Sequence, residues 1–355
     1  MIIDCHGHYT TAPAEHEEWR RSQVAADADH RSDPSRPTFG DDLLRETLAA
    51  NQVRVQHERG VDLTLFSPRA ASMGHHLGSA AANERWAREC NDLIHRACAL
   101  FPSDFVGVCQ LPQAPGAPPA ASVPELRRCV EELGFVGCNI NPDPSGGYWS
   151  GPPLTDRSWY PLYEAMVELD VPAMIHVSAS GNPAVDTTGA HYLNGDTTVF
   201  MQLVAGDLFR DFPTLRFVIP HGGGAVPYHW GRFRGLARGL GRPSLAEHLL
   251  DNVFFDTCVY HRAGLDLLTE VIPPENILFA SETIGAVNGV DPETGADFDD
   301  TLRLLDQAVA GDAPARQSIV EDNARRVYGR LSTQLERQRA EPAAPSGRAA
   351  EGIPA

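Results

Sequence analysis

Short, almost continuously apolar runs alternate with helix-like segments along this chain of 355 residues. Runs of this length, rich in β-branched residues, are typical of parallel strands that are covered on both faces. The eight runs are Ile2–Cys5, Val61–Phe66, Phe105–Leu111, Phe135–Ile140, Val171–Val177, Leu215–Pro220, Asn252–Asp256 and Asn276–Ala280. Eight alternating β and α units predict one (β/α)8 TIM barrel. A doubly wound open sheet is the alternative, and the lack of a Gly-x-Gly-x-x-Gly turn after the first run disfavours it.

The charge balance restricts the partners that this chain can have. The formal net charge is −18, which argues against nucleic acid and anionic membranes, because both need a basic surface. No leader-like start is present and no apolar run reaches about 18 residues, so we expect neither secretion nor a membrane span. Seven cysteines, an odd number without framework spacing, predict buried free thiols in a reducing cytoplasm.

The domain organisation follows from where long polar segments interrupt the alternation. We expect residues 1–331 to form a single metal-dependent barrel domain. Three long segments, Thr10–Gly40, Asn141–Asp156 and Gly285–Asp297, follow predicted strands, and the first is an insertion without a clear strand. Because barrel active sites are built at the carboxyl ends of the strands, these segments are candidate lids, with surface decoration as the alternative. Residues 332–355 lack a periodic apolar face and are predicted to be disordered.

Imidazole and carboxylate side chains stand at the carboxyl ends of several predicted strands. Side chains alternate along a strand, so His6 and His8 project the same way, with Asp4 behind them. The complete set is His6, His8, His176, His221 and Glu282. If the barrel forms, these groups converge at one rim and predict a mononuclear metal site with a position open to water or substrate. Nitrogen and oxygen ligands without thiolate favour Zn²⁺, with Mn²⁺ or Fe²⁺ as alternatives.

This pattern carries a family resemblance. His-x-His on the first strand, His176, His221-Gly-Gly-Gly and an acid after the eighth strand resemble the amidohydrolase superfamily. The chain is similar to the branch that contains metal-dependent decarboxylases such as aminocarboxymuconate semialdehyde decarboxylase. That branch usually has Ser-Asp after strand eight, with the Asp on the metal. Here Ser281 is followed by Glu282, whose side chain is one methylene longer.

Longer strings resemble a hydratase subfamily within that branch. They begin with Asp-Cys-His-Gly-His-Tyr-Thr-Thr-Ala-Pro near the start of the chain and continue at 141–147, 187–194, 221–235, 254–261, 280–287 and 323–328. The likeness is weakest in Thr10–Gly40 and Asp297–Gln317. It implies a zinc-dependent lyase that adds water across the carbon–carbon double bond of a small tricarboxylate, 4-oxalomesaconate. The product would be 4-carboxy-4-hydroxy-2-oxoadipate, in the protocatechuate 4,5-cleavage pathway of aromatic breakdown.

The resemblance also implies roles for the residues at the rim. By position, His6, His8 and His176 would hold the zinc ion. Glu282 would be a fourth ligand, the group that transfers a proton, or both in different states. His221 is a candidate general acid or base, or a group that holds water, with a purely structural histidine as the alternative.

An acidic protein needs local positive charge to bind a trianion. The candidate substrate-binding residues are Arg69, Tyr192, Asn194, Arg232 and Arg234. An arginine can bind a carboxylate through a bidentate fork, although a solvated helix face is the alternative for Arg232 and Arg234. Cys258 and Tyr260, after the seventh predicted strand, are predicted to serve packing.

Other functions compete with the hydratase. A metal-dependent hydrolase of a lactone or amide would use the usual Asp base, and a decarboxylase of the same branch would use it too. Glu282 at that position disfavours both. A non-catalytic metal-binding protein is disfavoured by five ligand-type residues around one rim. We also expect a homo-oligomer, with a dimer as the simplest form.

Overall fold

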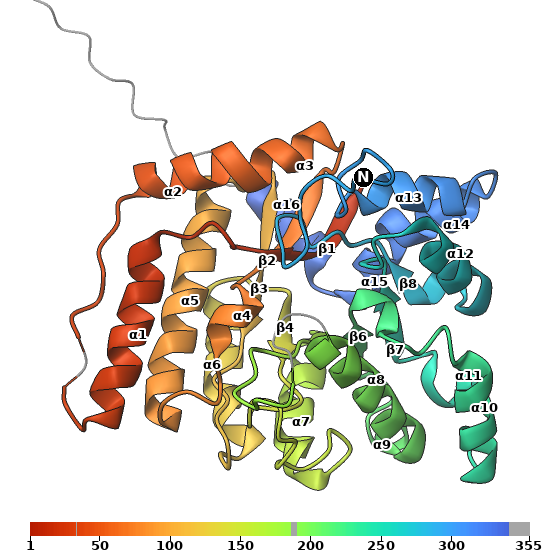
Figure 1. Cartoon of the computed structure of the whole chain (residues 1–355), viewed down its shortest axis with the longest axis horizontal. Helices are drawn as coiled ribbons and strands as arrows, with labels where there is room; N and C mark the ends of the chain where they lie inside the picture. Colours follow the sequence, from red (N-terminus) through yellow and green to blue (C-terminus); the bar gives the residue numbers. More distant parts are fainter. Residues whose placement is uncertain (33, 186–189, 341–355) are drawn as a thin grey trace, which may run out of the picture.

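The structure, a computed structural model, describes residues 1–32, 34–185 and 190–340. Eight parallel strands pair in chain order around its centre (Figure 1). They are β1 Ile3–His8, β2 Leu63–Ser67, β3 Phe105–Gln110, β4 Gly137–Ile140, β5 Ala173–Ile175, β6 Phe217–Ile219, β7 Val253–Asp256 and β8 Ile277–Leu278. Hydrogen bonds from Cys5 N to Phe279 O (2.9 Å) and from Glu282 N to His6 O (2.9 Å) join β1 to the chain after β8. The sheet is therefore a nearly closed barrel, which confirms the predicted (β/α)8 fold.

Helices surround the strands and alternate with them along the chain (Figure 1). The α-helices are α1 Ala14–Ala28, α2 Asp41–Leu48, α3 Arg54–Glu58, α4 Ala70–Met73, α5 Ala80–Leu100, α6 Val123–Arg127, α7 Tyr160–Glu168, α8 Ala190–Ala205, α9 Leu208–Asp211, α10 Trp230–Gly239, α11 Leu245–Leu249, α12 Arg262–Val271, α13 Thr301–Ala308, α14 Ala313–Gln317, α15 Asn323–Val327 and α16 Leu331–Ala340. Short 3₁₀ or π segments are η1 Ala49–Val53, η2 Pro119–Ser122, η3 Arg128–Glu132, η4 Arg157–Trp159, η5 His221–Gly223, η6 Pro274–Asn276 and η7 Ser318–Asp322. The expected insertion 10–40 contains α1, which packs beside α5.

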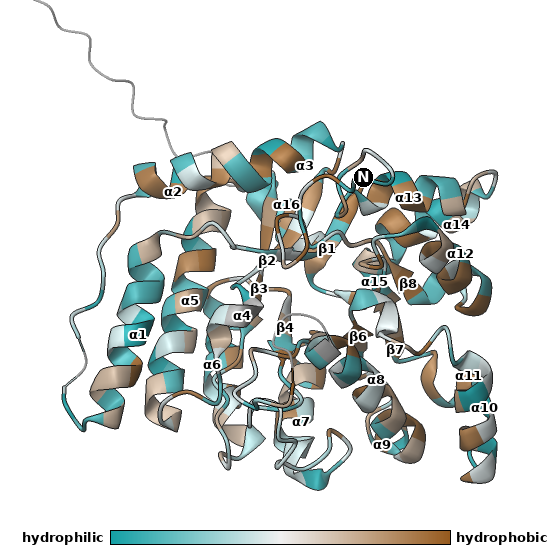
Figure 2. Cartoon of the chain, viewed as in Figure 1, coloured by the Kyte–Doolittle hydropathy of each residue, from teal (hydrophilic) through white to brown (hydrophobic). Residues whose placement is uncertain are grey.

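The core has two apolar layers. One lies inside the barrel, where residues from all eight strands or their edges form a single cluster that includes Ile3, Leu65, Met174 and Phe254. The other lies between the strands and the surrounding helices. Figure 2 shows the amphipathic pattern that this second layer requires, because helices such as α5 carry both hydrophilic and hydrophobic residues. Fully burying one such Leu or Phe side chain contributes roughly 1.5–3 kcal/mol, so the two layers dominate the stability of the fold.

The segment after residue 331 differs from its prediction. Residues 332–340 were expected to be disordered, but the structure continues them as α16. Leu331 and Leu335, one helical turn apart, are buried in the cluster inside the barrel, and Gln338 donates to Phe105 O at 3.1 Å. Two apolar residues at this spacing are enough to dock a short helix. The prediction was wrong for these nine residues, and 341–355 lie outside the described residues.

A change of pairing register in β1 arranges the side chains at the start of the site. The register of β1 against β2 shifts between Asp4 and Gly7, as in a β-bulge. Cys5 packs in the cluster inside the barrel, whereas Asp4 faces a small cavity on the outer side of the strand. His6 and His8 still share one face, as predicted, but Asp4 does not stand behind them. The bulge aims both imidazoles at the mouth of the barrel.

Two further observations bear on the setting of the protein. All seven cysteines are buried and free, as predicted. Within 1–32, 34–185 and 190–340, the helices are too short or too polar to cross a lipid bilayer.

Candidate metal centre

Three histidines meet at the mouth of the barrel. The Nε2 atoms of His6, His8 and His176 form a triangle with edges of 3.0, 3.0 and 3.1 Å. The first two side chains extend from β1, and the third directly follows β5. All three side chains are buried. The predicted set of three imidazoles is therefore brought to one point.

The partners of the other ring nitrogens show which nitrogen carries the proton. His8 Nδ1 lies 3.1 Å from Pro68 O, and His176 Nδ1 lies 3.2 Å from Val177 O. A carbonyl oxygen only accepts, so each Nδ1 donates and each Nε2 presents a lone pair. His6 Nδ1 likewise donates to an acceptor, the carboxylate of Asp256, so its Nε2 also presents a lone pair. Three lone pairs that face one point repel one another unless a cation lies between them.

This donor set fits a zinc ion. Zinc–nitrogen bonds of about 2.0–2.1 Å place three bound nitrogens about 3.0–3.4 Å apart, which matches the triangle. Burial lowers the pKa values of His8 and His176 well below the ordinary value, and the neighbouring imidazoles add to this effect. Neutral imidazoles are the form that binds metal.

Asp256, at the end of β7, orients His6. Its Oδ2 lies 2.8 Å from His6 Nδ1, and its Oδ1 accepts from the backbone N–H groups of Gly222 and Cys258, both at 3.0 Å. Burial opposes ionisation of this carboxyl, but the hydrogen bond and charge of His6 outweigh it, so the pKa of Asp256 is lowered. A carboxylate that fixes a metal-ligating histidine in this way also raises the basicity of its Nε2.

Glu282 faces the triangle from the loop that follows β8, beside β1. Its carboxylate lies within 4.8 Å of the ligand atoms of His6 and His8, so these three side chains could share one ion. Tyr260 donates its hydroxyl to Glu282 Oε2 at 2.9 Å. Tyr260 was predicted to serve packing. Its hydroxyl also holds a carboxylate that faces both the histidine triangle and His221.

The backbone at Glu282 and Ile284 has a left-handed conformation that residues other than glycine rarely adopt. The φ of Glu282 is +50°, and the φ of Ile284 is +58°. Each such residue costs on the order of 1–3 kcal/mol, and the cost is greatest for β-branched side chains. A Cβ added at Gly285 would lie 2.8 Å from Glu282 Cδ and 2.5 Å from Glu282 O. The carboxylate therefore sits where it does only because residue 285 has no side chain.

His221 stands opposite Glu282. Its Nε2 lies 4.0 Å from Glu282 Oε2, and its Nδ1 lies 2.8 Å from Asp196 Oδ2. Burial lowers the pKa of His221, but the carboxylates of Asp196 and Glu282 outweigh burial and raise that pKa to about 9. The ring packs against Tyr192 with centroids 4.4 Å apart. His221 and Glu282 are therefore paired so that one can hold a proton that the other gives up.

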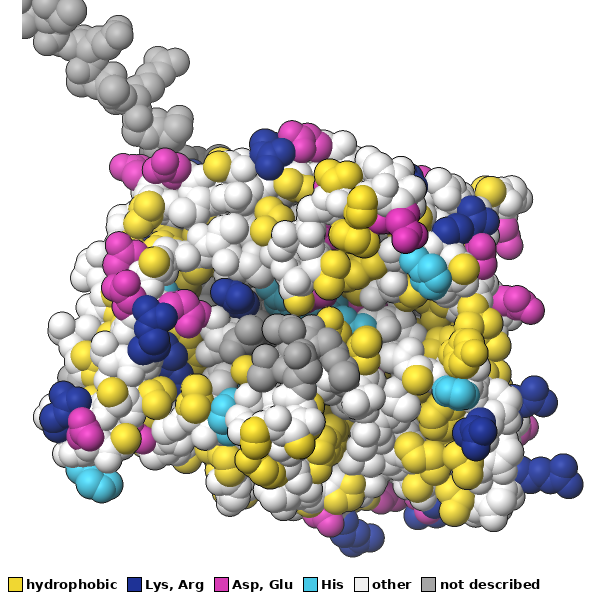
Figure 3. All heavy atoms as spheres, viewed as in Figure 1, with side chains coloured by type: hydrophobic (Ala, Val, Ile, Leu, Met, Phe, Trp, Pro, Cys, Tyr) yellow, Lys and Arg dark blue, Asp and Glu magenta, His cyan; other side chains and the backbone are white. Residues whose placement is uncertain are grey.

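His8, His176, His221 and Glu282 line one cavity of about 460 Å³. Arg69 and Tyr192, two of the candidate substrate-binding residues, line it too, together with Thr10, Thr11 and Asn288. In Figure 3, histidine atoms and the atoms of a basic side chain are visible in a hollow near the middle of the face. Among the described residues that line this cavity, Arg69 alone carries a guanidinium. A guanidinium can bind a carboxylate through a bidentate fork.

Other candidates lie elsewhere. Arg232 and Arg234 are exposed on α10 and do not line this cavity within one chain, and Asn194 is exposed on α8. No contact of these three residues supports substrate binding, so their role stays a prediction. One of the strings that carry the family resemblance spans 187–194. Its first three residues, 187–189, lie outside the described residues.

Two acidic residues of the site were missed from the sequence. Asp256 ends the seventh apolar run, a position equivalent to those of the predicted ligands, and this placement could have marked it. Asp196 lies on α8, 25 residues before its partner His221, and a single acid on a helix gives no such signal.

The amidohydrolase family profile matches residues 3–330. The chain belongs to the amidohydrolase family. Within this family, it is 59% identical over 335 residues to a 2-keto-4-carboxy-3-hexenedioate hydratase of a Sphingobium species. That match covers 94% of this chain and 98% of the relative.

The crystal structure of a 4-oxalomesaconate hydratase from Rhodopseudomonas palustris superposes with a TM-score of 0.89 and 55% identity, covering 96% of this chain and 99% of that one. A γ-resorcylate decarboxylase from Rhodococcus jostii is more distant, with 29% identity over 272 residues, 69% of this chain and 80% of the relative. Both hydratases are therefore more similar to this chain, and matched over more of its length, than this decarboxylase.

Proposed function

We propose that this protein is a hydratase, a hydro-lyase that adds water to the carbon–carbon double bond of 4-oxalomesaconate or its isomer 2-keto-4-carboxy-3-hexenedioate. The product would be 4-carboxy-4-hydroxy-2-oxoadipate, formed in protocatechuate 4,5-cleavage. The observation that carries this proposal is Glu282, a carboxylate within reach of a three-histidine metal centre and of His221. Similarity to two hydratases over nearly the whole chain supports it.

The chemistry of the substrate defines what the site must do. In 2-keto-4-carboxy-3-hexenedioate the double bond between C3 and C4 is conjugated to the ketone at C2. The water oxygen adds to C4 and a proton is delivered to C3, so the charge that develops in between resides on the ketone oxygen as an enolate. The reaction therefore needs an electrophile near that oxygen and a group that moves protons.

The residues of the cavity match these two needs. His6, His8 and His176 would hold zinc, which supplies a Lewis acid for the developing enolate when it is bound. Mn²⁺ and Fe²⁺ accept the same donors. Glu282 takes the proton of the attacking water or delivers one to C3. His221 exchanges protons with Glu282 across 4.0 Å, through a shift of either side chain or one water.

Recognition of a trianion falls to the rest of the cavity. Arg69 binds one carboxylate of the substrate, and the Tyr192 hydroxyl donates to another oxygen. Arg69 concentrates positive charge at the mouth of a protein whose net charge is −18. This local charge offsets the long-range repulsion that an acidic protein exerts on an anion.

Decarboxylation and hydrolysis fit the site less well. In both alternatives the acid after β8 is expected to be an Asp, but this chain has Glu282. The decarboxylase relative is also the more distant in sequence.

We infer that the enzyme works in the cytoplasm as a homodimer. The buried free thiols suit a reducing compartment. Exposed apolar side chains on and beside α10, among them Tyr228 (76% exposed), Leu236 and Leu240, support a contact with a second copy. Light scattering of the purified protein would give the mass, and a monomer across the working concentrations would remove the dimer.

The hydratase is tested by the ultraviolet absorbance of the conjugated substrate. Purified protein loaded with zinc should bleach the chromophore, and a chelator should stop the bleaching until metal is returned. No loss of the chromophore at any metal loading would rule out this function. Release of carbon dioxide in place of hydrated product would identify a decarboxylase.

A further inference from the structure

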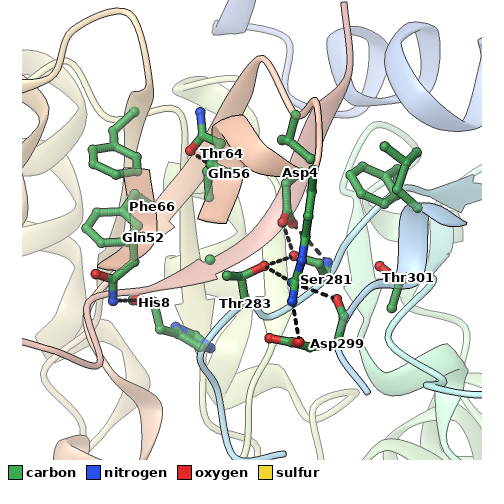
Figure 4. Close-up of a pocket in the computed structure, with 16 residues that line it drawn as sticks. Asp4, His8, Gln52, Gln56, Thr64, Phe66, Ser281, Thr283, Asp299 and Thr301 are labelled. Atoms are coloured by element: carbon green, nitrogen blue, oxygen red, sulfur yellow. Dashed lines mark hydrogen bonds and ion pairs between the residues drawn. The ribbon is translucent and has the colours of Figure 1, made fainter. Parts of the chain in front are cut away.

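Behind Glu282, on the outer side of β1, lies a second and much smaller cavity of about 20 Å³. Figure 4 shows polar side chains from several parts of the chain around it, among them Asp4, Ser281, Thr283 and Asp299. Asp4 comes from β1 and Asp299 precedes α13, while Ser281 and Thr283 flank Glu282 on either side. None of these four side chains lines the substrate cavity.

An inner set of hydrogen bonds ties the residue before Glu282 to β1. Ser281 donates its backbone N–H to Asp4 Oδ1 at 3.1 Å and its hydroxyl to Asp4 Oδ2. The hydroxyls of Ser281 and Thr283 lie 2.6 Å apart (Figure 4). These contacts bind the loop that carries Glu282 to β1, the strand from which His6 and His8 extend.

An outer set ties the residues after Glu282 to α3. Arg59, the residue that directly follows α3, donates to Thr283 Oγ1 at 3.1 Å and to Asp299 Oδ1 at 2.7 Å. It also donates to Asp299 O at 3.2 Å and to Asp297 Oδ2 at 3.3 Å. The second oxygen of Asp299 accepts from the backbone N–H of Ile284 at 3.0 Å. Arg59 therefore reaches the backbone of the catalytic loop through a single carboxylate.

The position of these bonds explains how the loop keeps its conformation. Glu282 and Ile284 have the left-handed backbone, and a free chain would relax from it. Hydrogen bonds hold the residues on each side of Glu282 and the N–H of Ile284 itself. The Arg59 side chain is 13% exposed and that of Asp299 is 3% exposed, so the pair is shielded from competing water.

We propose that Arg59 and Asp299 are positioning residues for Glu282, which hold its loop in the conformation that the reaction needs without touching the substrate. The expected effect on kcat rests on the proposed function. The expected effect on the conformation of the loop rests on the structure alone. The guanidinium matters for its fork as well as its charge, because it bonds a hydroxyl, a carbonyl and two carboxylates at once.

The test compares five single variants and one double variant of the full chain loaded with zinc. Arg59→Met and Asp299→Asn break the tether, and Arg59→Lys keeps the charge without the fork. Leu331→Ala, in the apolar cluster at the opposite end of the barrel, is a control for lost stability alone. Arg54→Met removes an exposed pair with Glu58 on the same helix and controls for lost charge. The readouts are kcat, KM and amide hydrogen exchange of the peptide that contains Ile284, the last also measured without metal.

For Arg59→Met and Asp299→Asn we expect kcat to fall about 10–100-fold, with KM changed little and exchange at Ile284 accelerated. Arg59→Lys should recover part of kcat. The double variant should be no slower than Arg59→Met, because the two residues act as one unit. Both controls should keep the wild-type kcat and the slow exchange.

Unchanged exchange at Ile284 in folded Asp299→Asn would overturn the tether. A kcat within twofold of wild type despite faster exchange would overturn its role in catalysis. If Arg59→Met does not fold, Arg59→Lys and Asp299→Asn carry the same two tests. A wild-type protein without hydratase activity refutes the proposed function instead, and the exchange measurement then still decides whether the loop is tethered.

Discussion

At the scale of single residues, one carboxylate depends on an unusual number of neighbours. Glu282 is bonded by Tyr260, faces His221 and is closely approached by Gly285. A side chain one methylene longer than Asp has an additional torsion, so it needs more neighbours to fix it. The site supplies those neighbours, which is consistent with a carboxylate that must act at a defined place.

Glu282→Gln should lower kcat by at least about 10³-fold, because an amide has nearly the same size but cannot accept and return a proton. Zinc content, measured by atomic absorption, should stay at least partly intact if proton transfer is the main role. A parallel loss of zinc and activity would show that Glu282 is chiefly a ligand. Wild-type turnover would exclude both roles.

Gly285→Ala should lower kcat by roughly 10-fold or more, because the new Cβ would lie 2.8 Å from Glu282 Cδ and displace it. Gly231→Ala is the matched control, since a Cβ there meets nothing within 4 Å and the residue lies within α10. The control should be neutral or slightly stabilising. Equal kinetics in the two variants would show that the close approach at Gly285 is not needed.

How far the sequence predicts this site depends on the kind of residue. His6, His8, His176 and Glu282 could be found because each stands where an apolar run ends. The role of Tyr260 could not, because a tyrosine in a loop gives no local sign that its hydroxyl will meet a carboxylate 22 residues away.

At the scale of secondary structure, apolar runs predict where strands lie better than how long they are. The run Asn276–Ala280 contains only two residues in regular pairing, Ile277 and Leu278, because the chain then leaves the sheet toward the metal centre. β1, by contrast, extends past Cys5 through His8. The helix α16 was missed because it docks through only two leucines among polar residues.

Leu331→Ala should lower the free energy of unfolding by about 2–5 kcal/mol, because it removes a fully buried side chain at the foot of the barrel. Leu240→Ala, at a position that is 52% exposed, should change it by less than about 1 kcal/mol. Urea denaturation followed by circular dichroism gives both values. A small loss at Leu331 would mean that α16 contributes little to the core.

At the scale of the whole molecule, the metal centre connects parts of the barrel that are far apart in the chain. The three histidines of the triangle come from β1 and the end of β5, and Asp256, which orients His6, comes from the end of β7. An ion bound there is linked to the folded state only, because the unfolded chain has no such triangle.

Zinc should therefore raise the melting temperature. At a free concentration near 100 times its Kd the gain is about 2.7 kcal/mol, which corresponds to a rise on the order of 5 °C. Differential scanning calorimetry of metal-free and zinc-loaded protein measures the shift. His176→Ala should remove most of it, whereas the same shift in that variant would place the bound zinc elsewhere.

The seam between β1 and the chain after β8 has a consequence for biosynthesis. Asp4 and Ser281, which lie on its two sides, are 277 residues apart. A nascent chain therefore displays His6 and His8 long before Glu282 leaves the ribosome, and neither the seam nor the complete centre exists until then. We expect newly made enzyme to acquire its metal only after that point, so zinc supply should affect the activity of the finished protein more than its rate of synthesis.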